Sequence, residues 1–222
     1  MNETQPEQLI RFGGGGAART LPMPPKQARG VEKRDRLYRA ALARFHTDGV
    51  RATRIEDVVN DAGVSWATFF RYFPRKEDVL VEAAARHFRE QVVAAARDGL
   101  RDRRLRIRTV LERIFSALLT PGELSPPLHT TALQEVLADP PRFAALVDGS
   151  NQAPLVALVE EVLQEGRRRG EVRSDVLAAT EALTLSAGAM FPAVQAASAG
   201  LDPRPIVADA LKVLWGGLEP RR

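Results

Sequence analysis

The chain has 222 residues and no cysteine, which leaves room for one large or two small domains but excludes a disulfide framework and a thiolate metal site. No run approaches eighteen consecutive apolar residues, and the N-terminus lacks a charged-then-apolar leader, so we expect a cytoplasmic protein with no membrane partner. The net charge of +4 lies in residues 1–80, with 14 Lys/Arg against 10 Asp/Glu, which fits an N-terminal part that meets a polyanion but is also common in soluble domains.

Residues 1–30 contain GGGG at 13–16 and PMPP at 22–25, a composition typical of a flexible tail. The glycine run lacks a following Gly-Lys-Ser/Thr, so a phosphate-binding loop is not expected. The basic residues Arg19, Lys26 and Arg29 would allow the tail to enter a DNA minor groove as an arm. The alternative is a disordered tail without that role.

Two helices are predicted next, over residues 31–47 and 55–62. The second carries an apolar stripe at i, i+3, i+4 and i+7 that begins at Ile55. Thr53 and Glu56 have the spacing of a capping box at its start. Gly63 is placed to end the helix, because the left-handed C-cap conformation is least costly for glycine.

A short helix is predicted over residues 66–72, with Ser65 as its N-cap and its end fixed by Phe73, which precedes Pro74. Phe69 and Phe73 lie four apart and are expected to pack on the core. The remaining side chains of the helix must face elsewhere, so an exposed arginine flanked by aromatic residues is available to a DNA groove. Two helices joined by a tight turn, with the second exposed, form the layout of a helix-turn-helix.

The segments DGVRAT, AGVS and ATFFRYFPRKED resemble the N-terminal domain of the TetR family of transcriptional regulators, over roughly residues 33–80. The resemblance implies that helix 66–72 and its cap face DNA and that Lys76 contacts a phosphate. The DNA-facing residues that it implies are Ser65, Trp66, Ala67, Thr68, Phe70, Arg71 and Tyr72.

Four positions depart from the common pattern of that family. Phe70 stands where tyrosine is common, and Tyr72 stands where histidine is common, so one hydroxyl is lost and another gained. Arg54 replaces a small hydroxyl residue, which leaves the cap to Thr53 and makes Arg54 a candidate phosphate contact. Thr53 is a candidate DNA-binding residue as well. Arg75 replaces the serine that usually precedes the lysine. These changes affect the expected half-site sequence and leave the DNA-binding expectation in place.

The rest of the chain is helical by pattern, with breaks at glycine and proline. We expect a long helix over 75–98, ended by Gly99, and further helices over 103–120, 128–138, 140–149, 154–169, 175–199 and 204–216. The fold class is therefore all-α. We expect three parts: a tail over 1–30, a helix-turn-helix domain over 31–78 and a helical effector-binding and dimerisation domain over 79–222.

An effector pocket is expected between the helices of the C-terminal domain, as the resemblance implies. Apolar residues predominate there, so the effector would be a hydrophobic or amphipathic small molecule. An ordinary bundle core is the alternative reading of the same residues. The candidate pocket residues are Leu111, Ile114, Phe115, Leu118, His129, Leu133, Gln134, Leu137 and Phe143.

A homodimer is expected because symmetric DNA readout needs two copies, and because residues 182–199 contain no charged side chain. Pro192 is expected to kink this helix or to mark a local break in its hydrogen bonding. A central helix of a monomer is the alternative. The candidate interface residues are Leu155, Leu158, Val162, Leu183, Ala187 and Phe191.

No catalytic or metal-binding motif is present: the three histidines are scattered, and no G-x-S-x-G elbow occurs. We therefore expect no enzyme, no cofactor and no metal. The sequence favours a ligand-responsive repressor that binds a palindromic double-stranded DNA operator as a homodimer. The alternative is a helical small-molecule-binding or protein-interaction module that no longer reads a specific operator.

Overall fold

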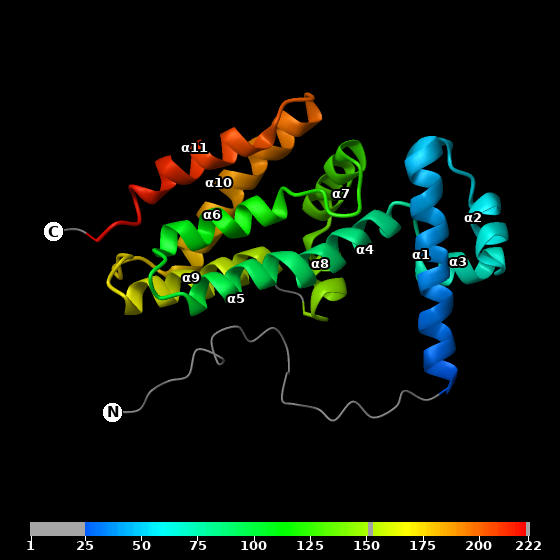
Figure 1. Cartoon of the computed structure of the whole chain (residues 1–222), viewed down its shortest axis with the longest axis horizontal. Coiled ribbons are helices and arrows are strands. Elements are labelled where there is room, and N and C mark those ends of the chain that lie inside the picture. The colour runs from blue at the N-terminus through cyan, green and yellow to red at the C-terminus, as the bar shows by residue number, and fades with distance from the viewer. Residues whose placement is uncertain (1–24, 151–152, 221–222) are drawn as a thin grey trace. The chain divides into compact units, whose positions relative to one another are not determined.

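The computed structural model describes residues 25–150 and 153–220, and all regular structure within these ranges is helical (Figure 1). The prediction of an all-α fold is confirmed. Residues 1–24 of the expected tail lie outside the described residues, whereas residues 25–30 form the start of helix α1. The helices are α1 (Pro25–Ala52), α2 (Ile55–Ala62), α3 (Trp66–Tyr72), α4 (Asp78–His87), the π-helix η2 (Phe88–Val92), α5 (Val93–Arg101), α6 (Ile107–Leu118), α7 (Pro126–Ala138), α8 (Pro140–Val147), α9 (Pro154–Arg168), α10 (Ala178–Ser198) and α11 (Pro203–Trp215).

The described chain divides into two compact units, and the division differs from the expected boundary at residue 78. The DNA-binding unit consists of residues 25–84 and 122–138, and the C-terminal unit of 85–121, 139–150 and 153–220. Helix α7 thus belongs to the DNA-binding unit. One hydrophobic cluster contains Leu37 and Tyr38 of α1 together with Leu128 and Ala132 of α7 and Leu124, which precedes α7.

Helix α1 begins at Pro25, six residues before the predicted start. Proline is well tolerated in a first helical turn, since the N–H that it lacks would have no helical partner there. The regular helix stops at Gly49, whose φ of 78° is left-handed, so Gly49 separates the main part of α1 from its last residues.

The predicted long helix over 75–98 is one continuous helical run from Asp78 to Arg101, interrupted by the π-helical turn η2. The expectation that Gly99 ends it is wrong. Gly99 is buried, and a Cβ at this position would lie 3.0 Å from Cγ1 of Val110 on α6. The glycine therefore permits close packing of α5 on α6.

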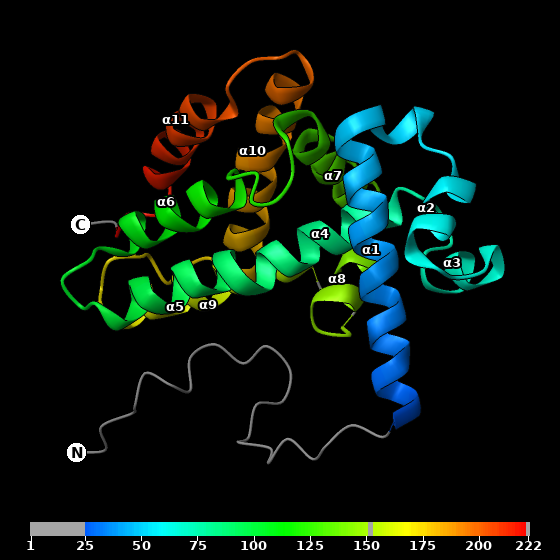
Figure 2. The same cartoon turned by 45° about the vertical axis from the view of Figure 1, so that its right-hand side comes forward.

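In the C-terminal unit, α10 packs between α9 and α11, and α10 and α11 run side by side (Figures 1 and 2). Pro192 is accommodated inside α10, which the structure describes as one helix over Ala178–Ser198. No helix within the described ranges is long and apolar enough to cross a membrane.

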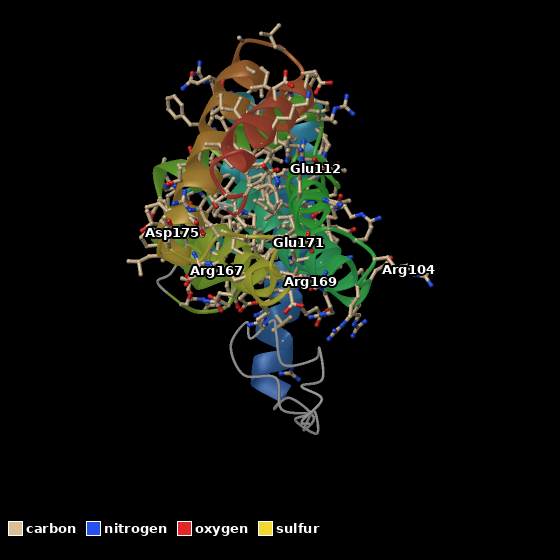
Figure 3. The ribbon with its side chains drawn as sticks, turned by 90° about the vertical axis from the view of Figure 1, so that its left-hand side faces the viewer. Arg104, Glu112, Arg167, Arg169, Glu171 and Asp175 are labelled. Carbon is tan, nitrogen blue, oxygen red and sulfur yellow. The ribbon has the colours of Figure 1, made fainter. Side chains whose placement is uncertain are left out.

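Partly buried polar contacts hold the turns at one end of this unit (Figure 3). Arg169 donates to the carbonyl oxygens of Leu100 and Leu105, at 3.0 and 3.1 Å, and the Glu171 carboxylate accepts from the Ile107 N–H at 3.0 Å. Burial raises the pKa of Glu165, but hydrogen bonds from Arg169 and Arg168 outweigh it and leave that pKa lowered.

Candidate nucleic-acid interface

The turn between α2 and α3 has the geometry that its sequence predicts. Gly63 ends α2 with φ 62° and ψ 42°, and the Val64 N–H donates to the Val59 carbonyl at 3.0 Å. Ser65 caps α3: its Oγ accepts from the Thr68 N–H at 3.3 Å and lies 2.8 Å from the Thr68 hydroxyl. Both local predictions, for Gly63 and for Ser65, are confirmed.

The predicted capping box at the start of α2 is wrong. Arg54 is the N-cap residue and makes no side-chain cap bond. The Thr53 hydroxyl instead donates to the Gly49 carbonyl at 2.8 Å, and Thr53 is only 4% exposed. Thr53 therefore supports the end of α1 from inside the unit, whereas the Arg54 side chain is exposed.

Helix α3 has a buried face and an exposed face. Phe69 and Phe73 are 0% and 1% exposed, which confirms their predicted packing role. Trp66, Ala67 and Arg71 are exposed. The other predicted DNA-facing residues of this segment include the exposed Ser65 and the half-buried Thr68, Phe70 and Tyr72.

The Arg71 guanidinium is folded onto its neighbour. Its Cζ lies 5.0 Å from the centroid of the Tyr72 ring, and one of its nitrogens donates to the Tyr72 hydroxyl at 3.3 Å. The contact leaves most of the guanidinium donors available. Arg71 is therefore positioned on the exposed face, with an orientation that Tyr72 restrains.

The two basic residues before α4 make contacts within the unit. Lys76 Nζ donates to the carbonyl oxygens of Arg51 and Thr53, at 3.0 and 3.4 Å, so it satisfies acceptors at the end of α1. Arg75 is paired with Asp78 at 3.3 Å and with Glu135 of α7 at 2.9 Å.

Asp78 and Glu135 were not among the predicted site residues. The Asp78 carboxylate also accepts from the Arg75 N–H at 2.7 Å, which is the reciprocal bond of a helix cap. Its position three residues after Arg75 is a signal that sequence reasoning could have used. No local signal exists for Glu135, which lies 60 residues away.

Ion pairs join the helices that carry α3. Arg34 of α1 binds Glu82 of α4 at 2.6 Å, and its guanidinium lies 5.6 Å from the Phe73 ring centroid. Arg44 of α1 binds Asp61 of α2 at 2.7 Å, and this hydrogen bond lowers the pKa of the Asp61 carboxyl. These pairs, with the shared core, tie α2 to α1 and α1 to α4 around the helix-turn-helix.

The predicted pocket residues fall in both units and remain a prediction. Leu111, Ile114, Phe115, Leu118 and Phe143 are buried side chains of the C-terminal unit. The other four residues lie on α7, in the DNA-binding unit: His129, Leu133, Gln134 and Leu137.

The predicted interface residues differ in exposure. Leu158 and Val162 are 0% exposed within the chain's own core, and Leu155 is half-buried. On α10, Leu183 and Phe191 are 59% and 65% exposed, and Ala187 between them is exposed as well. The exposed candidates thus lie on α10, whereas Leu158 and Val162 of α9 fill the chain's own interior.

Known proteins share both the motif and the fold. Residues 37–91 match the family model described as "Bacterial regulatory proteins, tetR family". The chain is 26% identical over 149 residues to the HTH-type transcriptional repressor KstR2 of Mycobacterium tuberculosis, which is 65% of this chain and 71% of that protein. It is 29% identical over 94 residues to an uncharacterized HTH-type regulator, YdgC, of Bacillus subtilis, which is 42% of this chain and about half (48%) of YdgC.

Solved structures share the fold of this chain. The TetR-family repressor FadR of Thermus thermophilus, in complex with lauroyl-CoA, aligns with a TM-score of 0.69 at 27% identity, covering 85% of this chain and 96% of FadR. FadR of Bacillus halodurans, a fatty acid degradation regulator, has the same fold, with a TM-score of 0.56 at 19% identity over 90% of this chain and all (100%) of that one. The helix-turn-helix geometry, the family match over residues 37–91 and the shared fold together support a transcriptional regulator of the TetR family.

Proposed function

We propose that this protein is an effector-responsive repressor that binds a palindromic operator as a homodimer. The observation that carries the proposal is the exposed face of α3, with Trp66, Ala67 and Arg71 outward on a helix that Phe69 and Phe73 anchor in the core. A helix presented in this way is the element that enters the major groove in helix-turn-helix proteins.

The proposed dimer forms through α10. Leu183, Ala187 and Phe191 are spaced four apart, so they lie along one face, and the helix has no charged side chain from Ala182 onward. An exposed face of this kind is stabilised by burial against a second copy, and a two-fold interface matches a palindromic operator. Phe191→Asp should therefore yield a monomer in light scattering. Leu201→Asp, which alters an exposed leucine beyond the end of α10, is the matched control that should leave the dimer intact.

The proposed effector is an amphipathic molecule with a long acyl chain, of the acyl-CoA class. Support comes from the Thermus thermophilus FadR complex with lauroyl-CoA and from the large apolar side chains of α6. Binding of effector and of operator would oppose each other with a reciprocal coupling of about 1–3 kcal/mol.

The test begins with selection of binding sites from a random duplex library by the purified full chain, followed by footprinting of the selected site. The proposal expects a symmetric protected site. Only sequence-independent, salt-sensitive binding would refute it. Lauroyl-CoA should then release the operator, with coenzyme A and laurate alone as controls. If lauroyl-CoA stabilises the protein yet leaves operator affinity unchanged, the acyl-CoA class is not the effector.

A further inference from the structure

An aromatic ladder leads from the core of the DNA-binding unit to the exposed start of α3. The rings of Phe73 and Phe69 have centroids 5.7 Å apart, and Phe69 meets Phe70 edge-on at 5.3 Å. Phe70 in turn contacts Trp66, with centroids 4.4 Å apart and ring planes at 54°. Exposure rises along the ladder, from 0% at Phe69 to 54% at Trp66.

The ladder holds a large apolar ring in place at the surface. Trp66 is the first residue of α3, and Phe70 lies one turn later on the same face, so the indole is backed by a ring that is itself packed on the core. Because the indole is restrained before binding, little side-chain entropy remains to be lost in a complex. An exposed tryptophan supported in this way is typical of a contact residue.

We propose that Trp66, backed by Phe70, reads the C5-methyl group of a thymine in each operator half-site. This inference rests on the proposed function, which places α3 in the major groove. There, the thymine methyl group is the apolar feature that distinguishes base pairs, and the N-terminal residues of a recognition helix are those that reach base edges.

The neighbouring polar side chains support this assignment. The Arg71 guanidinium, the strongest polar reader on the exposed face, is turned onto Tyr72 and lies more than one helical turn further along α3. Ser65 and Thr68 are hydrogen-bonded to each other in the cap. The large exposed group at the start of α3 is therefore the apolar indole of Trp66, which is 54% exposed.

The experiment uses the operator selected by the full chain and replaces each thymine in turn by deoxyuridine, which removes only the methyl group. Wild-type protein should bind about fourfold more weakly at one position per half-site, the loss expected for about 0.8 kcal/mol per buried methyl group. Trp66→Ala should weaken binding to the thymine operator and show no further loss with deoxyuridine. Trp66→Phe should recover part of the difference.

Arg54→Ala is the matched control, since Arg54 is exposed in the same motif: it should weaken both operators equally and keep the fourfold ratio. Thermal melting of Trp66→Ala should fall only slightly below that of wild type, because Trp66 is half-exposed and the variant loses only its ring contact with Phe70. If a specific operator is selected but no thymine responds to deoxyuridine, or if the response persists in Trp66→Ala, the methyl-reading role is overturned while the repressor proposal stands. If no specific operator is selected, the proposed function itself fails.

Discussion

Replacing Lys76 by methionine tests whether this lysine, a predicted phosphate contact, supports the fold. The substitution keeps the apolar stem and removes the ammonium that donates to the carbonyl oxygens of Arg51 and Thr53, at 3.0 and 3.4 Å. A hydrogen bond to a charged group contributes about 1.5–3 kcal/mol when well formed. The second bond is long and Lys76 is only half-buried, so we expect a loss of about 1–2 kcal/mol in the free energy of unfolding.

Urea unfolding of the free protein measures this loss, with an unchanged m-value as the sign that only stability has altered. Lys33→Met is the matched control, because Lys33 is exposed on α1 and has no ion pair or hydrogen bond within the described ranges. It should change stability by less than about 0.5 kcal/mol. If Lys76→Met is as harmless as the control, the capping argument is refuted, and a lowered salt slope of DNA binding alone would make Lys76 purely a phosphate contact.

Three further substitutions test the close packing at Gly166, the pH dependence that Glu165 contributes to stability, and the predicted reading of a base by Arg71. Gly166→Ala should destabilise the protein by about 1–2 kcal/mol in urea unfolding, because the new Cβ would lie 2.5 Å from Cγ2 of the stiff, buried Val172, and this clash outweighs the helix propensity of alanine. Gly30→Ala is the control: its Cβ would meet its neighbours at ordinary contact distances, so the variant should be neutral or stabilising. Equal effects of the two substitutions would contradict the packing argument. The lowered pKa of Glu165 means that, as pH falls, this carboxylate is protonated in the unfolded chain before it is protonated in the folded chain. The stability that it contributes is therefore present above about pH 4.5 and is lost below it. Glu165→Gln should reduce the fall in unfolding free energy at acid pH, and an unchanged pH dependence would rule out this linkage. Arg71→Ala should cost about 1–3 kcal/mol at one operator base pair in binding assays, whereas an equal loss on every sequence would make Arg71 a phosphate contact.

Local chemistry made much of the fold predictable from the sequence. Glycine and proline mark the helix ends, so α9, α10 and α11 begin and end within three residues of their predicted bounds. The turn before α3 was predictable for the same reason, because Gly63 and Ser65 act within a few residues of their own position. Such features depend on backbone conformations that the residue types themselves favour.

Sequence reasoning failed where two local options compete or where the partner is distant. Thr53 can cap α2 or bond back to α1, and the structure takes the second option, which the spacing to Glu56 could not exclude. A glycine can end a helix or admit a neighbour, and only the position of Val110 decides that Gly99 does the latter.

Helix α7 shows the limit of amphipathic patterns most clearly, because an apolar stripe predicts burial without identifying the core that it joins. Leu128 and Ala132 belong to the core of the DNA-binding unit, and Glu135 of the same helix binds Arg75 beside the helix-turn-helix. The chain therefore passes between the two units after residue 84, after 121 and after 138. Under the proposed function, an effector held by the C-terminal unit has two covalent routes to α3, one along α4 and one through α7. Glu135→Gln, which removes the ion pair between Arg75 and Glu135, tests the route through α7. If the effector acts along α4 alone, it should release the operator from this variant as readily as from wild type. If it also acts through α7, the effector should release the operator from the variant less readily.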